Sequence, residues 1–250
     1  MSTALALRGL LKRFGPRTAV DHLDLDVPAG SFYGVVGPNG AGKTTTLSMA
    51  TGLLRPDAGR AFVLGQDVWA DPVGAKHRLG VLPDGVRLFD RLSGLELVRY
   101  SGLLRGMPRD VVETRARELL DALGLAEAGS TLVVDYSAGM TKKVALACAL
   151  VHAPRVLVLD EPFEAVDPVS GATIRAILTS YVAGGGTVVL SSHVMDLVER
   201  LCDHVAVIAG GRVLAAGELS AVRAGRTLED RFVELVGGGR DVSGTLDWLR

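Results

Sequence analysis

The chain has 250 residues, of which 48% are hydrophobic and 22% carry a formal charge. That composition is enough for one large hydrophobic core or two small ones, and it excludes an intrinsically disordered protein. Basic and acidic residues number 27 and 28, so no strong overall charge draws the chain to nucleic acid, and we expect no nucleic-acid partner.

We expect neither a disulfide framework, nor a zinc site, nor a membrane-spanning segment. Cys148 and Cys202 lie far apart and lack metal-ligand spacing, which is typical of reduced core thiols in a cytosolic protein. The first residues lack the basic and apolar runs of a signal peptide. Residues 176–195 contain no Asp, Glu, Lys or Arg, but Gly184 to Gly186 interrupt them. That stretch therefore predicts a helix, a glycine turn and a buried strand.

The first quarter of the chain predicts short strands joined by turns, with one helix. Apolar residues alternate with aspartates over 23–27, and a Pro-Ala-Gly turn then leads into an apolar run. A second turn, at residues 55–59, ends the helix. In chain order, the expected elements are strands over 23–27 and 31–36, a helix over 43–53 and a strand over 60–64.

From residue 93 to residue 126 the apolar residues recur at three and four positions, which predicts a helical insert. Strands and helices then alternate, which implies a mostly parallel sheet with ligands at the carboxyl ends of its strands. After the insert we expect a helix from about 137, a strand over 156–159, a helix after 168, strands over 187–190 and 205–208, and an amphipathic helix over 228–236.

A glycine-rich segment directly follows the strand at 31–36, and it fits the phosphate-loop pattern Gly-x-x-x-x-Gly-Lys-Thr. Its glycines let backbone N–H groups turn toward a polyphosphate. The N-terminus of the next helix adds the positive end of the helix dipole. We expect Lys43 to reach the β- and γ-phosphates, Thr44 to bind Mg²⁺ and Thr45 to donate to the α-phosphate. The expected nucleotide-binding residues of this segment are Gly37, Pro38, Asn39, Gly40, Ala41, Gly42, Lys43, Thr44 and Thr45.

Two carboxylates, Asp160 and Glu161, follow the expected strand at 156–159. Their strand ends at the same sheet edge as the phosphate loop. Asp160 suits Mg²⁺ coordination through water, and Glu161 suits a general base that faces the attacking water. An apolar strand that ends in Asp-Glu is common and is a weak signal alone. Together with the upstream phosphate loop, the pair becomes a strong indication of phosphoryl transfer.

The segment 136–140, Tyr-Ser-Ala-Gly-Met, precedes the acidic pair and resembles the signature motif of ABC transporter ATPases. The resemblance covers about residues 5–236, with the motifs in the family's order. It implies an α/β fold with a P-loop NTPase (RecA-like) core around a mostly parallel sheet, an N-terminal antiparallel β subdomain and a helical signature-motif subdomain. It places the ATPase domain at 5–236, its helical insert at about 84–150 and a short C-terminal tail at 237–250.

The resemblance also assigns roles to single residues. It implies that Ser137 and Gly139, at the start of a helix, bind the γ-phosphate of a nucleotide that belongs to a second subunit. Asp167 matches the family's interface loop, His193 its γ-phosphate contact, and Phe14 the aromatic that stacks on adenine. Taken alone, Ser137 would be interpreted as an ordinary helix cap, His193 as a histidine without a special role and Phe14 as a core aromatic. No role is assigned to His22, His77, His152 and His204.

Four positions depart from the family's usual residues. Asp84 stands where Gln is common, and its shorter, anionic side chain can bind Mg²⁺ directly or through water. Tyr136 replaces Leu, and Ala138 replaces a Gly, which adds a methyl group at a crowded phosphate contact. Met140 replaces Gln and is familiar from exporter-type members, which favours an exporter-type (ABC-2-like) branch.

By resemblance, the chain is expected to be an ATP-binding and ATP-hydrolysing subunit that drives transport, with ATP and Mg²⁺ as its cofactors. Its partners would be a separate membrane permease and a second ATPase subunit, and it would lie as a peripheral cytoplasmic protein at the inner face of the cell membrane. Its expected catalytic residues are Lys43, Glu161 and His193, and its expected Mg²⁺ ligands are Thr44, Asp84 and Asp160.

The resemblance places permease contact in the insert between residues 84 and 126. We expect Arg91, Arg99 and Arg105 of this insert to be exposed, and they fit permease contact and plain solvated charge equally well. Two other functions remain open. One is a soluble ABC ATPase that acts on macromolecules without a permease. The other is a nucleotide-binding switch that barely hydrolyses, given the residues at 84 and 138.

Overall fold

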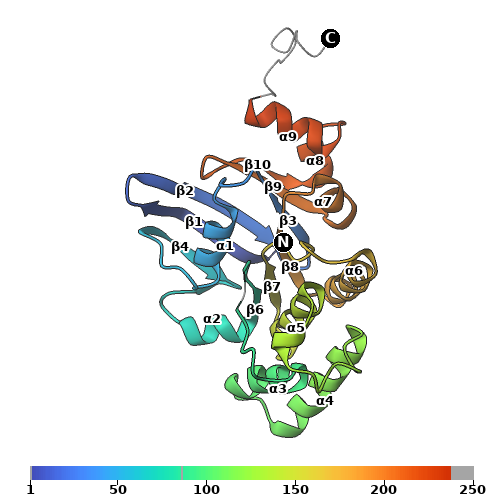
Figure 1. The fold of residues 1–250 in the computed structure, drawn as a ribbon. Helices are drawn as coiled ribbons and strands as arrows, with labels where there is room; N and C mark the ends of the chain where they lie inside the picture. Colours follow the sequence, from blue (N-terminus) through green and yellow to red (C-terminus); the bar gives the residue numbers. More distant parts are fainter. Residues whose placement is uncertain (1, 86, 238–250) are drawn as a thin grey trace, which may run out of the picture.

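The computed structural model describes residues 2–85 and 87–237. These residues form a four-stranded and a six-stranded β-sheet, with helices packed around them (Figure 1). The predicted α/β fold, with a mostly parallel core sheet and an N-terminal antiparallel sheet, is confirmed.

The four-stranded sheet is antiparallel throughout. Its strands are β1 (Thr3–Phe14), β2 (Arg17–Pro28), β4 (Ala58–Val63) and β5 (Gln66–Asp67), in the order β2-β1-β4-β5. Of these strands, the sequence predicted the inner part of β2 and most of β4. It did not predict β1, because a register shift beside Gly9, whose φ is +57°, breaks the alternation of apolar residues there.

Five strands of the six-stranded sheet run parallel, and the sixth pairs antiparallel at one edge. They are β3 (Phe32–Val36), β6 (Leu79–Leu82), β7 (Val156–Leu159), β8 (Thr187–Ser192), β9 (His204–Ala209) and β10 (Arg212–Glu218), in the order β10-β9-β3-β8-β7-β6. The four predicted strands of this sheet are confirmed. Because β3, β7 and β8 are neighbours and parallel, the segments that follow them meet at one edge.

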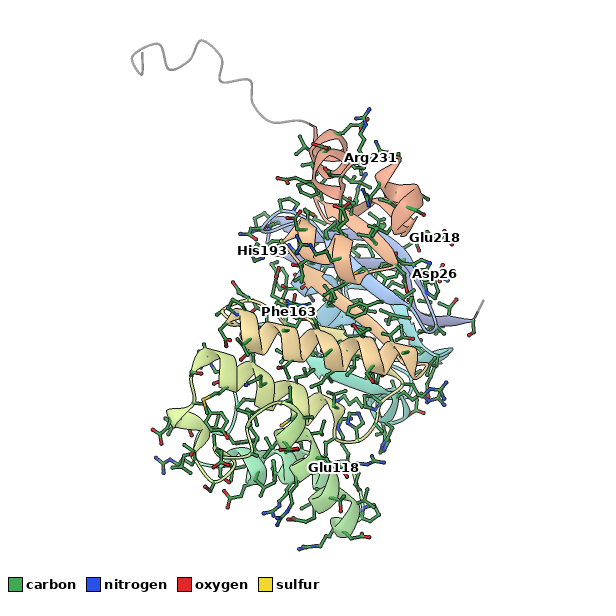
Figure 2. All side chains as sticks on the ribbon, turned by 90° about the vertical axis from the view of Figure 1, so that its right-hand side faces the viewer. Asp26, Glu118, Phe163, His193, Glu218 and Arg231 are labelled. Atoms are coloured by element: carbon green, nitrogen blue, oxygen red, sulfur yellow. The ribbon has the colours of Figure 1, made fainter. Side chains whose placement is uncertain are left out.

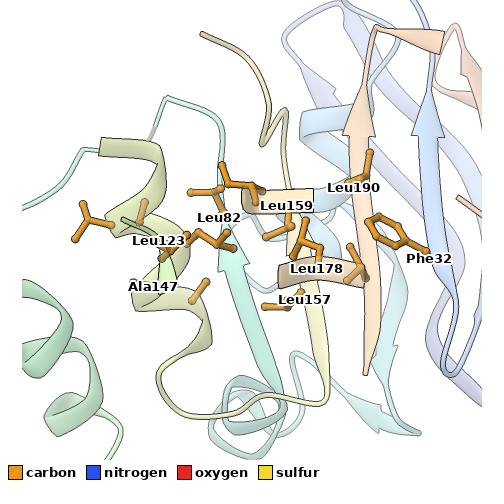
Figure 3. Packing of buried hydrophobic residues seen from close by; sticks show 14 of the residues in the cluster. Phe32, Leu82, Leu123, Ala147, Leu157, Leu159, Leu178 and Leu190 are labelled. Carbon is orange, nitrogen blue, oxygen red and sulfur yellow. The ribbon is translucent and has the colours of Figure 1, made fainter. Parts of the chain in front are cut away.

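The parallel strands bury both faces. In β3, Phe32 belongs to one hydrophobic cluster and Tyr33 to another, and such alternation continues along the neighbouring strands. Leu157, Leu159 and Leu190 extend the cluster of Phe32 (Figure 3). Burial on both faces explains why these strands are apolar without interruption.

The helices are α1 (Lys43–Ala50), α2 (Pro72–Arg78), α3 (Gly94–Leu104), α4 (Arg109–Ala122), α5 (Ala138–Leu150), α6 (Pro168–Ala183), α7 (Met195–Leu201), α8 (Leu219–Arg223) and α9 (Leu228–Val236), with a 3-10 turn at Val133–Asp135. The helices α5, α6 and α7 cover one side of the six-stranded sheet, whereas α1 and the antiparallel sheet cover the other (Figure 1). The α3–α4 pair lies at one end of the molecule and α9 at the opposite end (Figure 1).

Two expectations about helices and charges were wrong. The helix from Lys43 ends at Ala50 rather than at residue 53, because Gly52 adopts a φ of +75° that leaves the helical region. Arg99 and Arg105 are half-buried rather than exposed, since Arg99 pairs with Glu113 and Arg105 donates to a backbone carbonyl 2.6 Å away. Arg91 is exposed, as expected.

Both cysteines are free thiols, Cys202 buried and Cys148 half-buried. Burial raises the pKa of Cys148 to about 11, so its thiol stays protonated and unreactive near neutral pH. Among the described residues, no helix combines the length and the apolar character needed to cross a bilayer. The predicted tail lies outside the described residues apart from Gly237, and the domain boundaries stay predictions.

Candidate functional site

A cleft of about 510 Å³ opens where the segments after β3, β7 and β8 meet, with the β1–β2 hairpin beside it. His193, which follows β8 and lines the cleft, is labelled in Figure 2. The lining residues are Phe14, Arg17, Ala19, Asn39, Gly40, Ala41, Gly42, Lys43, Thr44, Thr45, Asp84, Glu161, Glu164 and His193.

The loop between β3 and α1 requires glycine at several positions. Gly40 and Gly42 have φ angles of +77° and +103°, which L side chains rarely adopt. A Cβ atom on Gly37 would lie 2.1 Å from the carbonyl oxygen of Ile208. Helix α1 begins directly after the loop, and no side chain of the described residues caps its first turn. Its free backbone N–H groups are therefore available to an anion in the cleft.

The ammonium group of Lys43 is folded back on the same loop. Its Nζ donates to the carbonyl oxygens of Gly37, at 2.7 Å, and of Pro38, at 3.3 Å. Only 7% of the residue is exposed. Two carbonyl groups thus hold a buried cation beside free N–H donors, which is an arrangement suited to a polyphosphate.

Asp160 and Glu161 are joined through one hydroxyl group. The Ser191 side chain, on β8, bonds to a carboxylate oxygen of Asp160 and accepts from the backbone N–H of Glu161 at 2.9 Å. Glu161 has a φ of +46°, in the left-handed region that non-glycine residues rarely adopt. Surrounding contacts hold this strained conformation.

Glu161 makes two further contacts that orient it. Its Oε2 atom lies 3.0 Å from Nδ1 of His193, and its carbonyl oxygen accepts from the Lys142 ammonium at 2.8 Å. Lys142 belongs to α5, so that helix is connected directly to the backbone of Glu161. A carboxylate beside a phosphate-binding loop, with its orientation fixed, is placed to accept a proton from water.

Asp160 fits a role beside a cation. It is 4% exposed, and no basic side chain among residues 2–85 and 87–237 forms an ion pair with it. A buried carboxylate without a counter-charge is costly, and a metal ion removes that cost. Thr44 and Asp84 add oxygen atoms on the adjoining cleft wall, which is the donor type that Mg²⁺ prefers.

Phe14 lies at the outer end of the cleft and is 51% exposed. The Lys12 ammonium is 5.7 Å from its ring centroid, and Asp57 and the Arg55 carbonyl fix that ammonium at 2.8 and 3.0 Å. An exposed aromatic ring of this kind can stack on a planar base.

The signature residues lie outside this cleft. Ser137 caps α5, since its hydroxyl accepts from the backbone N–H of Met140 at 3.2 Å. Asp167 caps α6 in the same way, and hydrogen bonding by the Ser170 side chain, then by the N–H groups of Ser170 and Val169, lowers the pKa of its carboxyl. A Cβ atom on Gly139 would lie 3.6 Å from the Asp167 carboxylate, so the two cap regions are neighbours.

The structure therefore divides the predicted site residues into two groups. Residues 39–45 of the phosphate loop gather around one cleft with Phe14, Asp84, Glu161 and His193, and Asp160 is buried beside it. Gly37 and Pro38, at the start of the loop, do not line the cleft. Ser137, Gly139 and Asp167 do not line it. Sequence reasoning missed Arg17, Ala19 and Glu164, which line the cleft but belong to no motif. The one available signal was the Gly-Pro turn that pairs Phe14 with Arg17.

Comparisons with known proteins agree with this geometry. Residues 20–164 match the family model described as ABC transporter. The daunorubicin/doxorubicin resistance ATP-binding protein DrrA of Streptomyces peucetius is 41% identical over 214 residues, which are 86% of this chain and 65% of that protein. The Nod factor export ATP-binding protein I of Cupriavidus metallidurans is 36% identical over 218 residues, or 87% and 72% of the two chains.

A solved structure, described as the ATP-binding subunit of an ABC transporter, superposes with a TM-score of 0.87 at 28% identity. It covers 94% of this chain and 100% of its own. The chain spans only about two thirds of the length of the relatives named above. The family match covers more than half of the chain and includes the phosphate loop, the signature segment and the acidic pair. The chain thus belongs to the ABC transporter family and carries its ATP-binding domain.

Proposed function

We propose that this chain binds Mg-ATP in the cleft, hydrolyses it together with a second ATPase subunit, and thereby drives export through a separate membrane permease. The observation that carries the proposal is the position of Glu161. Its carboxylate lines the cleft beside the phosphate loop, and three groups on other elements fix its backbone and side chain.

Lys43, Glu161 and His193 would each have a role in phosphoryl transfer. The N–H groups of residues 40–44 and the Lys43 ammonium would bind the β- and γ-phosphates, which neutralises charge that grows during transfer. Glu161 would accept a proton from the attacking water, and His193 would hydrogen-bond the γ-phosphate while it holds the Glu161 carboxylate. Phe14 would stack on the adenine ring.

Bound Mg²⁺ would neutralise phosphate charge in the cleft. Thr44, Asp84 and Asp160 are the residues that would hold it. Asp160 supports this assignment best, because no basic side chain among the described residues forms an ion pair with its buried carboxylate. Asp84 carries a negative charge at the cleft wall, which a nearby cation offsets.

A second subunit would complete the site. Ser137, Gly139 and Asp167 lie together outside the cleft of their own chain, so they would act on the nucleotide of the other subunit. Val134 and Val169, which flank these residues, are 61% and 77% exposed, and a partner surface would cover them. ATP would close the pair because it contacts both chains, and hydrolysis would release it.

The permease would bind beside α3. Phe89 and Tyr100 expose 60% and 40% of their surfaces, with their rings edge to face at a centroid distance of 5.4 Å. Leu104, one turn further along α3, is 68% exposed. Exposed apolar side chains that gather in this way are typical of a protein interface. That interface would place the chain at the inner, cytoplasmic face of a membrane.

Export rather than import follows from the relatives, whose names specify drug resistance and Nod factor export. The second candidate, a soluble ABC ATPase that acts on macromolecules, has the near-neutral net charge of the chain against it. Nucleic-acid-stimulated hydrolysis without a permease would favour that candidate.

The proposal is tested by Glu161→Gln in comparison with wild type, in Mg-ATP and in Mg-ADP. The amide cannot accept the proton, so turnover should fall about a hundredfold or more while ATP binding remains. With the γ-phosphate retained, the variant should elute as a dimer in Mg-ATP and as a monomer in ADP, by light scattering after gel filtration.

Glu118→Gln is the matched control. Glu118 is exposed on α4, far from the cleft (Figure 2), so this variant should hydrolyse ATP like wild type. Should Glu161→Gln hydrolyse ATP at the wild-type rate and remain a monomer, the composite site is wrong, and a soluble adaptor or a switch becomes the better function.

A further inference from the structure

The β1–β2 hairpin places a second side chain beside Phe14. Gly15 and Pro16 form its two-residue turn, and Phe14 and Arg17 are directly paired across the strands. Residues paired in this way project from the same face of a sheet. Both side chains accordingly line the cleft, and the Arg17 guanidinium donates to the Gly40 carbonyl at 3.3 Å.

The two other basic residues of the hairpin near Phe14, Lys12 and Arg13, differ from Arg17 in their contacts. Lys12 forms an ion pair with Asp57 at 2.8 Å. Arg13 does not line the cleft, and its backbone N–H donates to the same carboxylate. Arg17 is exposed and forms no ion pair with any described residue, so its charge is available to a ligand.

The balance of charges in the cleft indicates what the Arg17 guanidinium can bind. Among the described lining residues, Arg17 and Lys43 are the two permanent cations, whereas Asp84, Glu161 and Glu164 are carboxylates. A polyphosphate that enters such a cleft meets more negative than positive charge. Lys43 lies deep in the loop, and Arg17 stands above Gly40, on the side of Phe14.

We propose that Arg17 is a further nucleotide-binding residue, whose guanidinium moves from the Gly40 carbonyl to the α- or β-phosphate. The assignment rests on the proposed nucleotide binding. Its position between the aromatic ring and the phosphate loop matches the part of a nucleotide that lies between the base and the γ-phosphate. The planar guanidinium donates several N–H groups to phosphate oxygens, and the Gly40 carbonyl holds it ready.

Isothermal titration calorimetry with ADP, and with a non-hydrolysable ATP analogue, tests the assignment. Arg17→Met keeps the aliphatic length but loses the charge, and it should weaken binding of both nucleotides by the same factor of about tenfold. Arg17→Lys should fall between this variant and wild type. The control is Arg13→Met, which removes the same charge from the same hairpin outside the cleft and should bind like wild type. The loss should shrink at high salt.

Three results would overturn the proposal. In the first, Arg17→Met binds ADP as tightly as wild type does. In the second, the substitution weakens binding of the triphosphate alone, which would assign Arg17 to the γ-phosphate. Equal weakening of adenosine binding would assign it to the base or ribose. Melting curves without nucleotide check that each variant is folded. If wild type itself binds no ADP, the proposed function has failed rather than the role of Arg17.

Discussion

The phosphate loop and the signature segment both lead into a helix, but the two helix starts use their backbone donors differently. At α1 no side chain in the part of the chain that the structure describes caps the first turn, and the preceding glycines leave the N–H groups open. At α5 the hydroxyl of Ser137 already accepts from the Met140 N–H group. The first helix start is therefore ready for an anion, whereas at the second one N–H group is already bonded within its own chain.

This difference suggests that the cleft and the signature segment have separate roles. The cleft has the groups needed to bind a nucleotide within one chain, while the signature segment contributes only when a second chain presents a phosphate. Lys142 is a direct connection between the two regions, because it belongs to α5 and bonds to the backbone of Glu161. Binding and turnover should consequently respond to different substitutions.

The largest effect is expected from Lys43→Ala. It removes the buried ammonium that donates to the Gly37 and Pro38 carbonyl groups and would bind the phosphates. Nucleotide affinity should fall about a hundredfold or more, because a charge-assisted contact in a partly desolvated site is lost. Calorimetric titration with ADP measures this, and near-wild-type affinity would contradict the assigned phosphate loop.

Ser137→Ala should separate the two regions. The variant should bind ADP within about twofold of wild type but lose about tenfold or more in ATP turnover, because the missing hydroxyl acts on the other subunit's nucleotide. Loss of the cap should also lower the free energy of unfolding by about 1 kcal/mol. A parallel loss of ADP affinity would show that Ser137 serves its own cleft.

Mixing the two variants sharpens this test. Neither Lys43→Ala nor Ser137→Ala alone has an intact composite site, but their mixed dimer combines one intact cleft with one intact signature segment. An equal mixture should therefore recover about a quarter of wild-type turnover if the subunits pair at random. If the mixture shows no recovery at any ratio, the subunits do not share sites.

A smaller effect is expected from Tyr136→Phe, next to the signature serine. The buried Tyr136 hydroxyl donates to the Ala128 carbonyl at 2.7 Å. Its loss leaves a partly buried carbonyl without that donor, so the free energy of unfolding should fall by about 1 kcal/mol. Urea unfolding measures the change, and ADP affinity, a property of the cleft, should stay at the wild-type value.

The smallest effect concerns His152, which connects the far end of α5 to β6 through the Leu79 carbonyl, at 2.9 Å. Burial, aided by the charge of Arg105, lowers the pKa of His152 from 6.5 to about 4. As pH falls from 7 to 5, the unfolded chain takes up a proton that the folded chain does not, so the folded state loses stability. Allowing for partial solvent exposure, the loss should be about 1 kcal/mol.

His152→Gln keeps an N–H donor but does not titrate in this range, so it should remove that part of the pH dependence. Urea midpoints of wild type and variant, measured between pH 7 and pH 5, provide the comparison. Parallel curves for the two proteins would show that His152 is protonated as easily in the folded chain as in the unfolded one.

The sequence alone determined the local parts of this protein. The strand at 156–159, the phosphate loop and the helix at 228–236 lie where their patterns predict. Such features depend on residues close in the chain, since glycine spacing sets a loop and apolar periodicity sets a strand or helix. The order of the motifs also identified the family, which the comparisons confirm.

The tertiary structure decided which of these parts meet. Ser191, which lies 30 residues after Glu161 in the sequence, bonds to both Asp160 and Glu161. Phe14 and Arg17 reach the cleft because the β1–β2 hairpin lies beside the phosphate loop. Arg105 is half-buried although its charge predicts exposure. These outcomes depend on strand order and on packing between distant segments, which no short sequence pattern encodes. The set of residues that line the cleft is therefore determined by the assembled sheet.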